Sequence, residues 1–335
     1  MISRKFIIWA CGLLFVFGSC AEDMVKPIEN DKDAPGTVQD VKTESLPGAV
    51  KFTYTLPSDP DLLYVLAKYT NKTGKVMEFR SSFYTNSVTV EGFGDTDTYK
   101  VELYTVDRSE NRSQPQIVEV APLTPPILSC YESLSVVSDF GGMTFEMDNK
   151  FKSDLAIYVC TPDELGDMVL AETFYSAREE IVYSVRGYDA VPRRFGIFLQ
   201  DKYGNETDTL FTELTPIYER ELDKTKFREM YLQNDSRVDS YDGKMEYVWN
   251  GRISKDGDSG GVGLHTGTGT KDGPAVFTFD LGVLAKLSRF ALWAIQDEKH
   301  FYNDMSPRRY EVWGCATEPN PDGSWDQWVK LLDME

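Results

Sequence analysis

One local pattern occurs twice in this chain, about one small domain apart. The segment Asp-Arg-Ser-Glu-Asn at 107–111 has a counterpart in Asp-Lys-Tyr-Gly-Asn at 201–205, 94 positions later, and each follows an apolar, strand-like run. The Leu-Thr-Pro sequences at 123–125 and 214–216 are likewise 91 positions apart. Self-similarity at a nearly constant offset is the signature of a duplicated structural unit. The sequence therefore predicts two tandem modules of similar build, with prolines that stiffen their junctions.

Within these modules the residues alternate between apolar and polar with the period of a β-strand. In the first module the runs 50–56, 63–69 and 99–106 show this pattern, and turn-forming residues separate them. About seven short strands in roughly 90 residues are typical of a β-sandwich. The block 35–122 resembles a fibronectin type III module, and the block 123–219 repeats its organisation.

The C-terminal third carries an ordered series of short motifs built from aromatic and turn-forming residues. They are Trp-Asn-Gly at 249–251, Phe-Thr-Phe-Asp-Leu-Gly at 277–282, the strand-like run 287–293, the Arg-Tyr-Glu-Val-Trp-Gly region at 307–314 and the Pro-Asp-Gly-Ser-Trp region at 321–328. Alternation that stops at glycine predicts strands, and Asn-Gly or Asp-Gly predicts tight turns. In order and spacing, residues from about 225 to 335 resemble a discoidin-type galactose-binding domain.

This resemblance implies a jelly roll that binds ligand with the loops at one end of its barrel. The last motif lies close to Glu335, so we expect the roll to lack its final strands. The predicted fold class is all-β: two tandem β-sandwich (fibronectin III/immunoglobulin-like) modules, then a discoidin-like jelly roll truncated at its C-terminus. The expected parts are a lipoprotein signal peptide at 1–20, a flexible tether at 21–34, β-sandwiches at 35–122 and 123–219, and an incomplete discoidin-like domain at 220–335.

The first 20 residues have the pattern of a secretory signal. A basic start at residues 4 and 5 precedes the apolar run 6–17, which is too short to span a membrane. The Gly-Ser-Cys ending resembles a bacterial lipobox and implies that Cys20 is lipidated, whereas ordinary cleavage near Ala21 is the alternative. The acidic pair after Ala21 resembles the signal that sends lipoproteins of Bacteroidetes to the outer face of the outer membrane.

The order of signal, two sandwiches and discoidin-like module resembles a family of Bacteroidetes surface lipoproteins that are commonly encoded beside outer-membrane glycan importers. It implies a lipid-anchored outer-membrane protein that faces the cell exterior and captures a glycan or glycoprotein for the importer complex. The alternative is a structural or adhesion subunit of a surface complex, whose discoidin-like face binds a protein. A protein partner favours an exposed aromatic patch over a small pocket.

The charge balance argues against nucleic acid, and the residue content argues against catalysis. With 35 Lys and Arg against 54 Asp and Glu, the formal net charge of −19 repels phosphate backbones. The two histidines of the chain are His265 and His300, and a Ser-His-Asp or Cys-His site would need one of them. Neither a P-loop nor a His-Glu-x-x-His motif occurs in the sequence. A two-carboxylate glycosidase needs no histidine, but the sequence nominates no pair among its 54 acidic residues and the expected fold does not favour one. We therefore predict that the protein is not an enzyme.

Three cysteines remain outside the signal. Cys130 and Cys160 lie in one module of a protein exported to an oxidising compartment, so a disulfide between them and two free thiols are both open. Cys315 would then be left over. The sequence contains no Cys-x-x-Cys motif or Cys/His cluster, so no structural zinc site is predicted.

Sugar recognition suggests which residues bind ligand. An aromatic ring lies beneath the C–H patch of a sugar, and charged or amide side chains reach its hydroxyls. Trp293 and Trp313 lie in strand alternation and are expected in the core, and a core position is also the alternative for Trp249. The polar, aromatic loop at 297–306 is the favoured location. The predicted ligand-binding residues are Trp249, Asn250, His265, His300, Tyr302, Asn303, Arg308 and Trp325.

A Gly-rich acidic loop is the candidate metal site. Within the segment 255–261, Asp256 and Asp258 offer the oxygen ligands that calcium prefers. The resemblance points the same way, since discoidin-like modules often carry a structural calcium ion, while a solvated Gly-rich loop is the alternative. No other cofactor is predicted.

Overall fold

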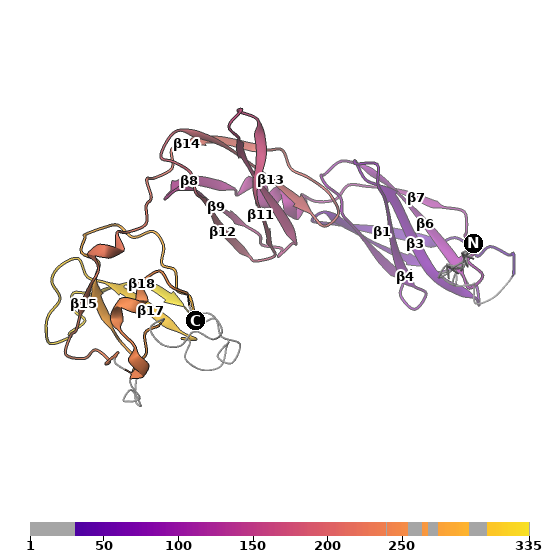
Figure 1. The fold of residues 1–335 in the computed structure, drawn as a ribbon. Coiled ribbons are helices and arrows are strands. Elements are labelled where there is room, and N and C mark those ends of the chain that lie inside the picture. Colours follow the sequence, from indigo (N-terminus) through magenta and orange to yellow (C-terminus); the bar gives the residue numbers. More distant parts are fainter. Residues whose placement is uncertain (1–30, 239, 254–262, 267–273, 295–306, 335) are drawn as a thin grey trace, which may run out of the picture. The chain divides into compact units, whose positions relative to one another are not determined.

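The computed structural model describes residues 31–238, 240–253, 263–266, 274–294 and 307–334 (Figure 1). Strands dominate these residues, which confirms the all-β prediction. The chain divides into two compact units. The first comprises Met1–Val137, Thr144–Ser184 and Arg193–Leu214, and the second comprises Ser138–Met143, Val185–Pro192 and Thr215–Glu335. Among the described residues, no helix is long and apolar enough to cross a membrane.

Seven antiparallel strands form the first β-sandwich. They are β1 Gln39–Leu46, β2 Ala49–Thr55, β3 Leu62–Thr70, β4 Val76–Ser82, β5 Ser87–Glu91, β6 Tyr99–Asp107 and β7 Gln116–Val120. One sheet has the order β1-β2-β5 and the other β4-β3-β6-β7. The predicted strand runs 50–56, 63–69 and 99–106 coincide with β2, β3 and β6.

Alternate side chains of these strands meet between the two sheets and form the core. Phe52, Val65 and Leu103 are fully buried there. The ring of Tyr69 stacks on that of Phe93 with 4.4 Å between centroids. The Tyr69 hydroxyl donates a 2.8 Å hydrogen bond to the backbone carbonyl of residue 91, so its polar end is satisfied inside the sandwich.

The second module begins with the helix α1 Pro126–Glu132, in which proline occupies the first turn, where the missing N–H costs least. Its strands are β8 Ser135–Asp139, β9 Gly142–Asp148, β10 Leu155–Pro162, β11 Met168–Ser176, β12 Glu180–Arg186, β13 Arg193–Asp201 and β14 Leu210–Leu214. The sheets have the orders β11-β10-β13-β14 and β12-β9-β8. Phe145, Ile157 and Phe195 are fully buried. Two tandem β-sandwiches are therefore confirmed.

The repeated pentapeptide forms the same turn in both sandwiches. One carboxylate oxygen of Asp107 accepts hydrogen bonds from the backbone N–H groups of Ser109 and Asn111, at 2.8 and 2.9 Å. The carboxylate of Asp201 accepts from the two equivalent N–H groups, both at 2.9 Å. The aspartate therefore closes the turn by capping its backbone, which explains why the residue recurs.

In the first compact unit, the second of these turns packs against a loop of the first sandwich. The side-chain amide of Asn205 donates to the backbone carbonyl of Gly92 at 3.1 Å, and the Tyr203 hydroxyl bonds the carboxylate of Glu91. A Cβ at Gly94 would lie 2.6 Å from the side-chain oxygen of Asn205. The contact therefore needs glycine in the loop and fixes how the turn sits on it.

After the second sandwich, the described residues form two strand pairs. β15 Arg228–Met230 pairs with β16 Thr278–Asp280, and β17 Tyr310–Gly314 pairs with β18 Val329–Met334. Three short 3₁₀ helices are also present, η1 Lys224–Lys226, η2 Ser240–Asp242 and η3 Met245–Val248. No larger sheet joins the pairs within the described ranges. The discoidin-like jelly roll therefore stays a prediction.

The segment 287–293 was expected to be a strand that places Trp293 in the core, and the structure differs. It forms no strand in the structure, and Trp293 is 61% exposed. Alternation buries one face of a segment only when a neighbouring strand pairs with it, and no described strand does so here.

Candidate functional site

Three tryptophans gather on the hairpin of β17 and β18 and on the loop that joins them. The Trp325 ring meets Trp313 edge-on, with 4.9 Å between centroids and 72° between planes. Trp328 lies 6.2 Å from Trp325. We call these residues the tryptophan cluster. Trp325 is 46% exposed, so part of this aromatic surface faces solvent.

The loop before Trp325 is held by its own polar side chains. Asp322 accepts from the backbone N–H of Ser324 at 2.9 Å, and Asn320 donates to the Ser324 hydroxyl at 3.0 Å. Gly323, between Asp322 and Ser324, has a φ of 73°. A Cβ on Gly323 would lie 2.9 Å from the side-chain amide nitrogen of Asn234. The glycine permits both the left-handed turn and the close approach, and so orients Trp325.

Charged groups border the same aromatic surface. The Lys330 ammonium lies 5.4 Å from the centre of the Trp313 ring, within range of a cation–π interaction. It also donates to Glu311 at 2.6 Å and to Asp333 at 2.8 Å. The Trp313 indole N–H donates to Glu311 at 2.9 Å. The hydrogen bonds from Lys330 and Trp313 lower the pKa of Glu311, so its carboxylate stays ionised near neutral pH.

This arrangement can hold a sugar ring. An exposed indole face suits the C–H patch of a sugar, and the neighbouring carboxylates and ammonium can bond its hydroxyls. Lys330 is shared between Glu311 and Asp333, so this set keeps a small net negative charge. The cluster therefore fits a neutral polar ligand better than an anion.

The other predicted residues within the described ranges are Trp249, Asn250, His265 and Arg308. Trp249 is half-buried and packs on Phe279, 5.2 Å between centroids, which favours its core alternative. Asn250 is exposed, and its side chain accepts from the backbone N–H of Arg252 at 2.8 Å. His265 is half-buried, and Arg308 is exposed two residues before β17.

Several predicted residues lie outside the described residues. These are the ligand-binding candidates His300, Tyr302 and Asn303, the calcium candidates Asp256 and Asp258, and the lipidation candidate Cys20. All remain predictions. The segment 257–261 also fits the Gly-x-Ser-x-Gly pattern of some hydrolases, so the non-enzyme prediction rests on the fold and on the scarcity of histidine.

Trp313, Trp328, Glu311 and Lys330 were not among the predicted ligand-binding residues. Trp313 was expected in the core because it lies in strand alternation, but the structure leaves it half-buried beside Trp325. Residues 311 and 313 share a strand face by their spacing of two, a signal already present in the sequence. Glu311 and Trp313 contact Lys330 because Lys330 pairs with Trp313 across the hairpin. Only the register of the two strands specifies that pairing.

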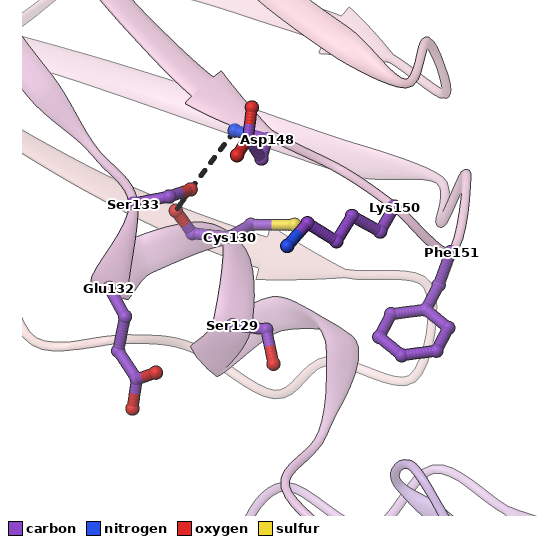
Figure 2. Close-up of a pocket in the computed structure, with 7 residues that line it drawn as sticks. All are labelled: Ser129, Cys130, Glu132, Ser133, Asp148, Lys150 and Phe151. Carbon is purple, nitrogen blue, oxygen red and sulfur yellow. Dashed lines mark hydrogen bonds between the residues drawn. The ribbon is translucent and has the colours of Figure 1, made fainter.

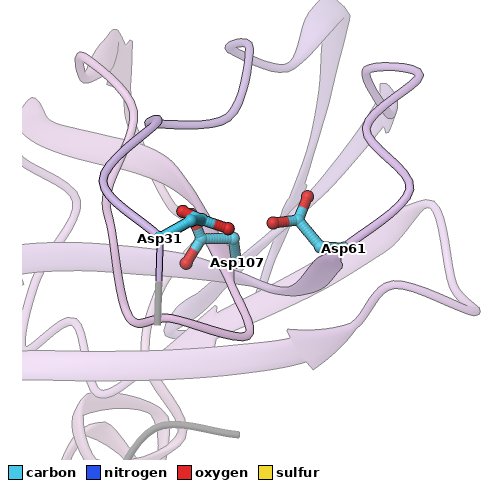
Figure 3. A group of neighbouring side chains, drawn as sticks. All are labelled: Asp31, Asp61 and Asp107. Carbon is cyan, nitrogen blue, oxygen red and sulfur yellow. The ribbon is translucent and has the colours of Figure 1, made fainter. Parts of the chain in front are cut away.

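Three carboxylates converge at one end of the first sandwich (Figure 3). Oxygen atoms of Asp31, Asp61 and Asp107 all lie within 4.8 Å of one another. The geometry alone would allow a cation, but both carboxylate oxygens of Asp107 already accept hydrogen bonds from its turn. The cluster is therefore explained as a structural feature of the turn. Burial, together with the charges of Asp31 and Asp107, raises the pKa of Asp61.

Changing Asp61 to Asn is expected to raise the melting temperature at pH 7. The pKa of Asp61 is higher in the folded state than in the unfolded state, so its protonated carboxyl stabilises the fold. This stability is complete below the unfolded pKa and is lost as the pH rises through the folded pKa. Asn resembles the protonated carboxyl and keeps its neutral charge at pH 7. The gain should shrink as the pH falls toward about 4. Thermal melts across that range test it, with Glu44→Gln on β1 as control. An equal gain at every pH would contradict the electrostatic cause.

A small cavity lies beside α1 in the second sandwich (Figure 2). Its walls come from α1 with its C-terminal capping residue and from the end of β9 with the turn that follows. The residues are Ser129, Cys130, Glu132, Ser133, Asp148, Lys150 and Phe151. Burial raises the pKa of the Cys130 thiol to about 11, so the thiol is protonated at neutral pH. A protonated thiol is a poor nucleophile, so Cys130 does not supply this cavity with a catalytic thiolate.

Cys130 and Cys160 are both free thiols in the structure, which decides the alternative left open by the sequence. Cys130 lies on α1, whereas Cys160 is half-buried on the side of β10 that faces away from the core.

In the protein starting at Ala21, we expect a thiol reagent at about pH 8 to modify Cys160 and Cys315 well before Cys130. Counting modified thiols by mass spectrometry tests this, and Cys130→Ser should leave the fast fraction unchanged. Equally fast reaction of Cys130 would contradict it.

Part of the chain is nearly identical to a SusE-like protein. The match to the SusE-like protein BT2857 has 99% identity, covers 35% of this chain and 66% of that chain, and has a TM-score of 0.33. The match therefore spans just under two thirds of that solved chain.

Other similarities concern parts of the chain. Three family models, each described as a domain of unknown function, match residues 35–122 (DUF4959), 123–225 (DUF5126) and 249–335 (DUF5000). A two-domain fibronectin type III segment of chicken tenascin is 12% identical, covering 54% of this chain and 99% of that chain at a TM-score of 0.26. The fibronectin domains of chicken CNTN1 are 10% identical over 54% of this chain and 67% of theirs, at 0.25. No curated protein matches the chain.

Proposed function

We propose that this protein is a non-catalytic surface lipoprotein that captures carbohydrate for an outer-membrane glycan importer. Near identity to a SusE-like protein supports a role in such a system. The lipobox-like ending at Cys20 supports a lipid anchor in the outer membrane, and the tandem sandwiches suit a spacer. The C-terminal region, with its discoidin-like motifs, supplies the ligand surface.

One observation carries the proposed binding role. Trp325 presents an exposed indole on a loop braced by hydrogen bonds, next to a paired set of acidic and basic side chains. Such a preorganised aromatic surface loses little entropy on binding a sugar. Glu311 is held ionised and paired, so it is poorly suited to donate a proton to a glycosidic oxygen. The cluster is therefore better suited to binding than to bond cleavage.

A glycan array on the protein starting at Ala21, followed by calorimetry on the best ligand, tests the proposal. Trp325→Ala should weaken binding by about tenfold or more, since loss of one stacked ring costs on the order of 1–2 kcal/mol. Tyr84→Ala is the matched control, because Tyr84 is a more exposed aromatic residue of the first sandwich. A folded protein that binds no glycan, or a Trp325 variant that binds as well as the parent, would overturn the proposal.

The alternative is a structural or adhesion subunit that binds a protein. An exposed aromatic patch favours such contacts. The second sandwich carries a patch of that kind, far along the chain from the tryptophan cluster, and its properties point to a separate role.

A further inference from the structure

The four-stranded sheet of the second sandwich has one face toward the core and one toward solvent. On β10, Ile157 and Val159 are fully buried, whereas Tyr158 and Cys160 between and beside them are half-buried. The same alternation holds on β13, where Ile197 is buried and Phe198 is half-buried. The residues between the buried ones therefore form the outer surface of this sheet.

The outward residues are mostly apolar across all four strands. Leu170, Cys160, Gly196 and Phe211 face one another in register and make a row from one edge of the sheet to the other. Leu170 is 56% exposed and Phe211 is 48% exposed. Together with Tyr158, Phe198 and Tyr175, these residues make what we call the apolar face.

The first sandwich provides an internal comparison at the same register. Its corresponding row consists of Glu78, Lys68, Glu102 and Ile117, paired in the same order across β4, β3, β6 and β7. Lys68 lies between two glutamates where the second sandwich has Cys160 between Leu170 and Gly196. The fold therefore tolerates charges at these positions. The apolar residues of the second sandwich are not required for folding, which points to a partner.

The rings on the apolar face make a flat, ordered surface. Tyr158 and Phe198 are stacked, with 4.8 Å between centroids and 12° between planes. The Phe211 ring lies against Gly196, where a Cβ would come within 2.9 Å of it, and the Arg194 guanidinium stacks on that ring at 4.1 Å. The apolar face is therefore rich in Tyr, Phe and Arg and poor in Lys and Glu. This composition is typical of the centre of a protein interface.

The border of the apolar face is acidic. Asp163, Glu164 and Asp167 lie at the tip of the β10–β11 hairpin, and Glu206 and Glu213 lie near β13 and on β14. The whole chain carries a net charge of −19. A second copy would bring a like-charged border against this one, so a partner with basic residues around an apolar centre is the better match.

We propose that the apolar face binds another protein, one that presents an apolar patch bordered by Lys and Arg. This role is distinct from carbohydrate capture and uses a different part of the chain. Aromatic rings at the centre supply most of the contact area, and the acidic border selects the partner and speeds its approach.

The test uses the full-length protein in its own cells, with a photo-crosslinking amino acid at position 211 and, in a matched control, at position 117. Phe211 and Ile117 occupy equivalent places in the two sandwiches, and both are exposed. A second variant combines Cys160→Lys with Leu170→Glu, which copies the Lys68–Glu78 pair of the first sandwich. This pair is compatible with the fold, so thermal melting should change little.

We expect position 211, and not position 117, to crosslink to one other protein. The paired substitution should reduce that product at least about tenfold, and in isolated membranes raised salt should release the partner, because its border contacts are ionic. Glycan binding through Trp325 should be unchanged, so the two proposals fail separately. A crosslink to a second copy or to polysaccharide, the same product at position 117, or no product from a folded protein would overturn the proposal.

Discussion

Phe145→Ala is expected to lower the free energy of unfolding by about 3–5 kcal/mol, as for other large-to-small changes in a packed core. Phe145 is fully buried on β9. Its ring meets Phe174 of β11 at 5.6 Å and Tyr183 of β12 at 6.0 Å, so one side chain joins strands of both sheets. Its removal leaves a cavity that those neighbours cannot fill. Chemical denaturation followed by tyrosine fluorescence measures the loss.

Val182→Ala on β12 is the control for this core. Val182 is next to Tyr183 in sequence but points outward and is 58% exposed. Its substitution should cost at most about 1 kcal/mol, mainly in strand propensity. If Phe145→Ala cost no more than this, the three rings would not form a common core.

Glu219→Ala should lower the stability of the second compact unit by about 2–3 kcal/mol, because it removes the carboxylate that Arg186 and Arg289 share and takes one of two carboxylate partners from the mostly buried Arg186. Glu219 accepts from Ser288 at 2.6 Å and from Arg289 at 2.8 and 3.0 Å. It also pairs with Arg186 at 3.4 Å, and Arg186 in turn pairs with Asp139 at 2.8 Å. The expected loss stays below that of a fully buried network, since the Arg289 side chain is largely exposed.

The same residue should make this unit sensitive to acid. Burial alone would raise the pKa of Glu219, but hydrogen bonds from Ser288 and Arg289 and the charges of both arginines outweigh it and lower the pKa. A lowered folded-state pKa contributes stability that is present above the unfolded pKa and is lost as pH falls through the folded value. Melting temperatures measured downward from about pH 5 should therefore fall more steeply in the parent than in Glu219→Ala.

Glu221→Ala separates this network from general acid effects. Glu221 is exposed and pairs with Lys224, three residues on, so its removal should change stability little. Parallel acid profiles for the parent and the Glu219 variant would show that other carboxylates set the acid limit.

Local patterns were enough to predict the architecture of the two sandwiches. A strand with a period of two carries its pattern in neighbouring residues, so 50–56, 63–69 and 99–106 could be recognised before any partner strand was known. The repeated Asp-x-x-x-Asn turn is equally local, because the aspartate caps N–H groups two and four residues on. Trp325 was predicted on the same basis, as an aromatic residue beside an Asp-Gly turn.

Properties that depend on partners distant in the chain could not be predicted in this way. Trp293 and Trp313 have similar local alternation, yet one is 61% exposed and the other packs beside Trp325, because burial depends on which strand pairs alongside. Cys130 and Cys160 could be assigned as free only once each had a place on its element.

The amino-acid sequence by itself therefore determined the all-β class, the duplication and the exposed tryptophan at the C-terminal turn, since each is written in residues a few positions apart. The tertiary structure alone decided that Lys330 and Glu311 meet at Trp313, and that Leu170, Cys160, Gly196 and Phe211 form one row. Register across strands set these neighbours, and a shift of one residue would have turned each side chain to the opposite face.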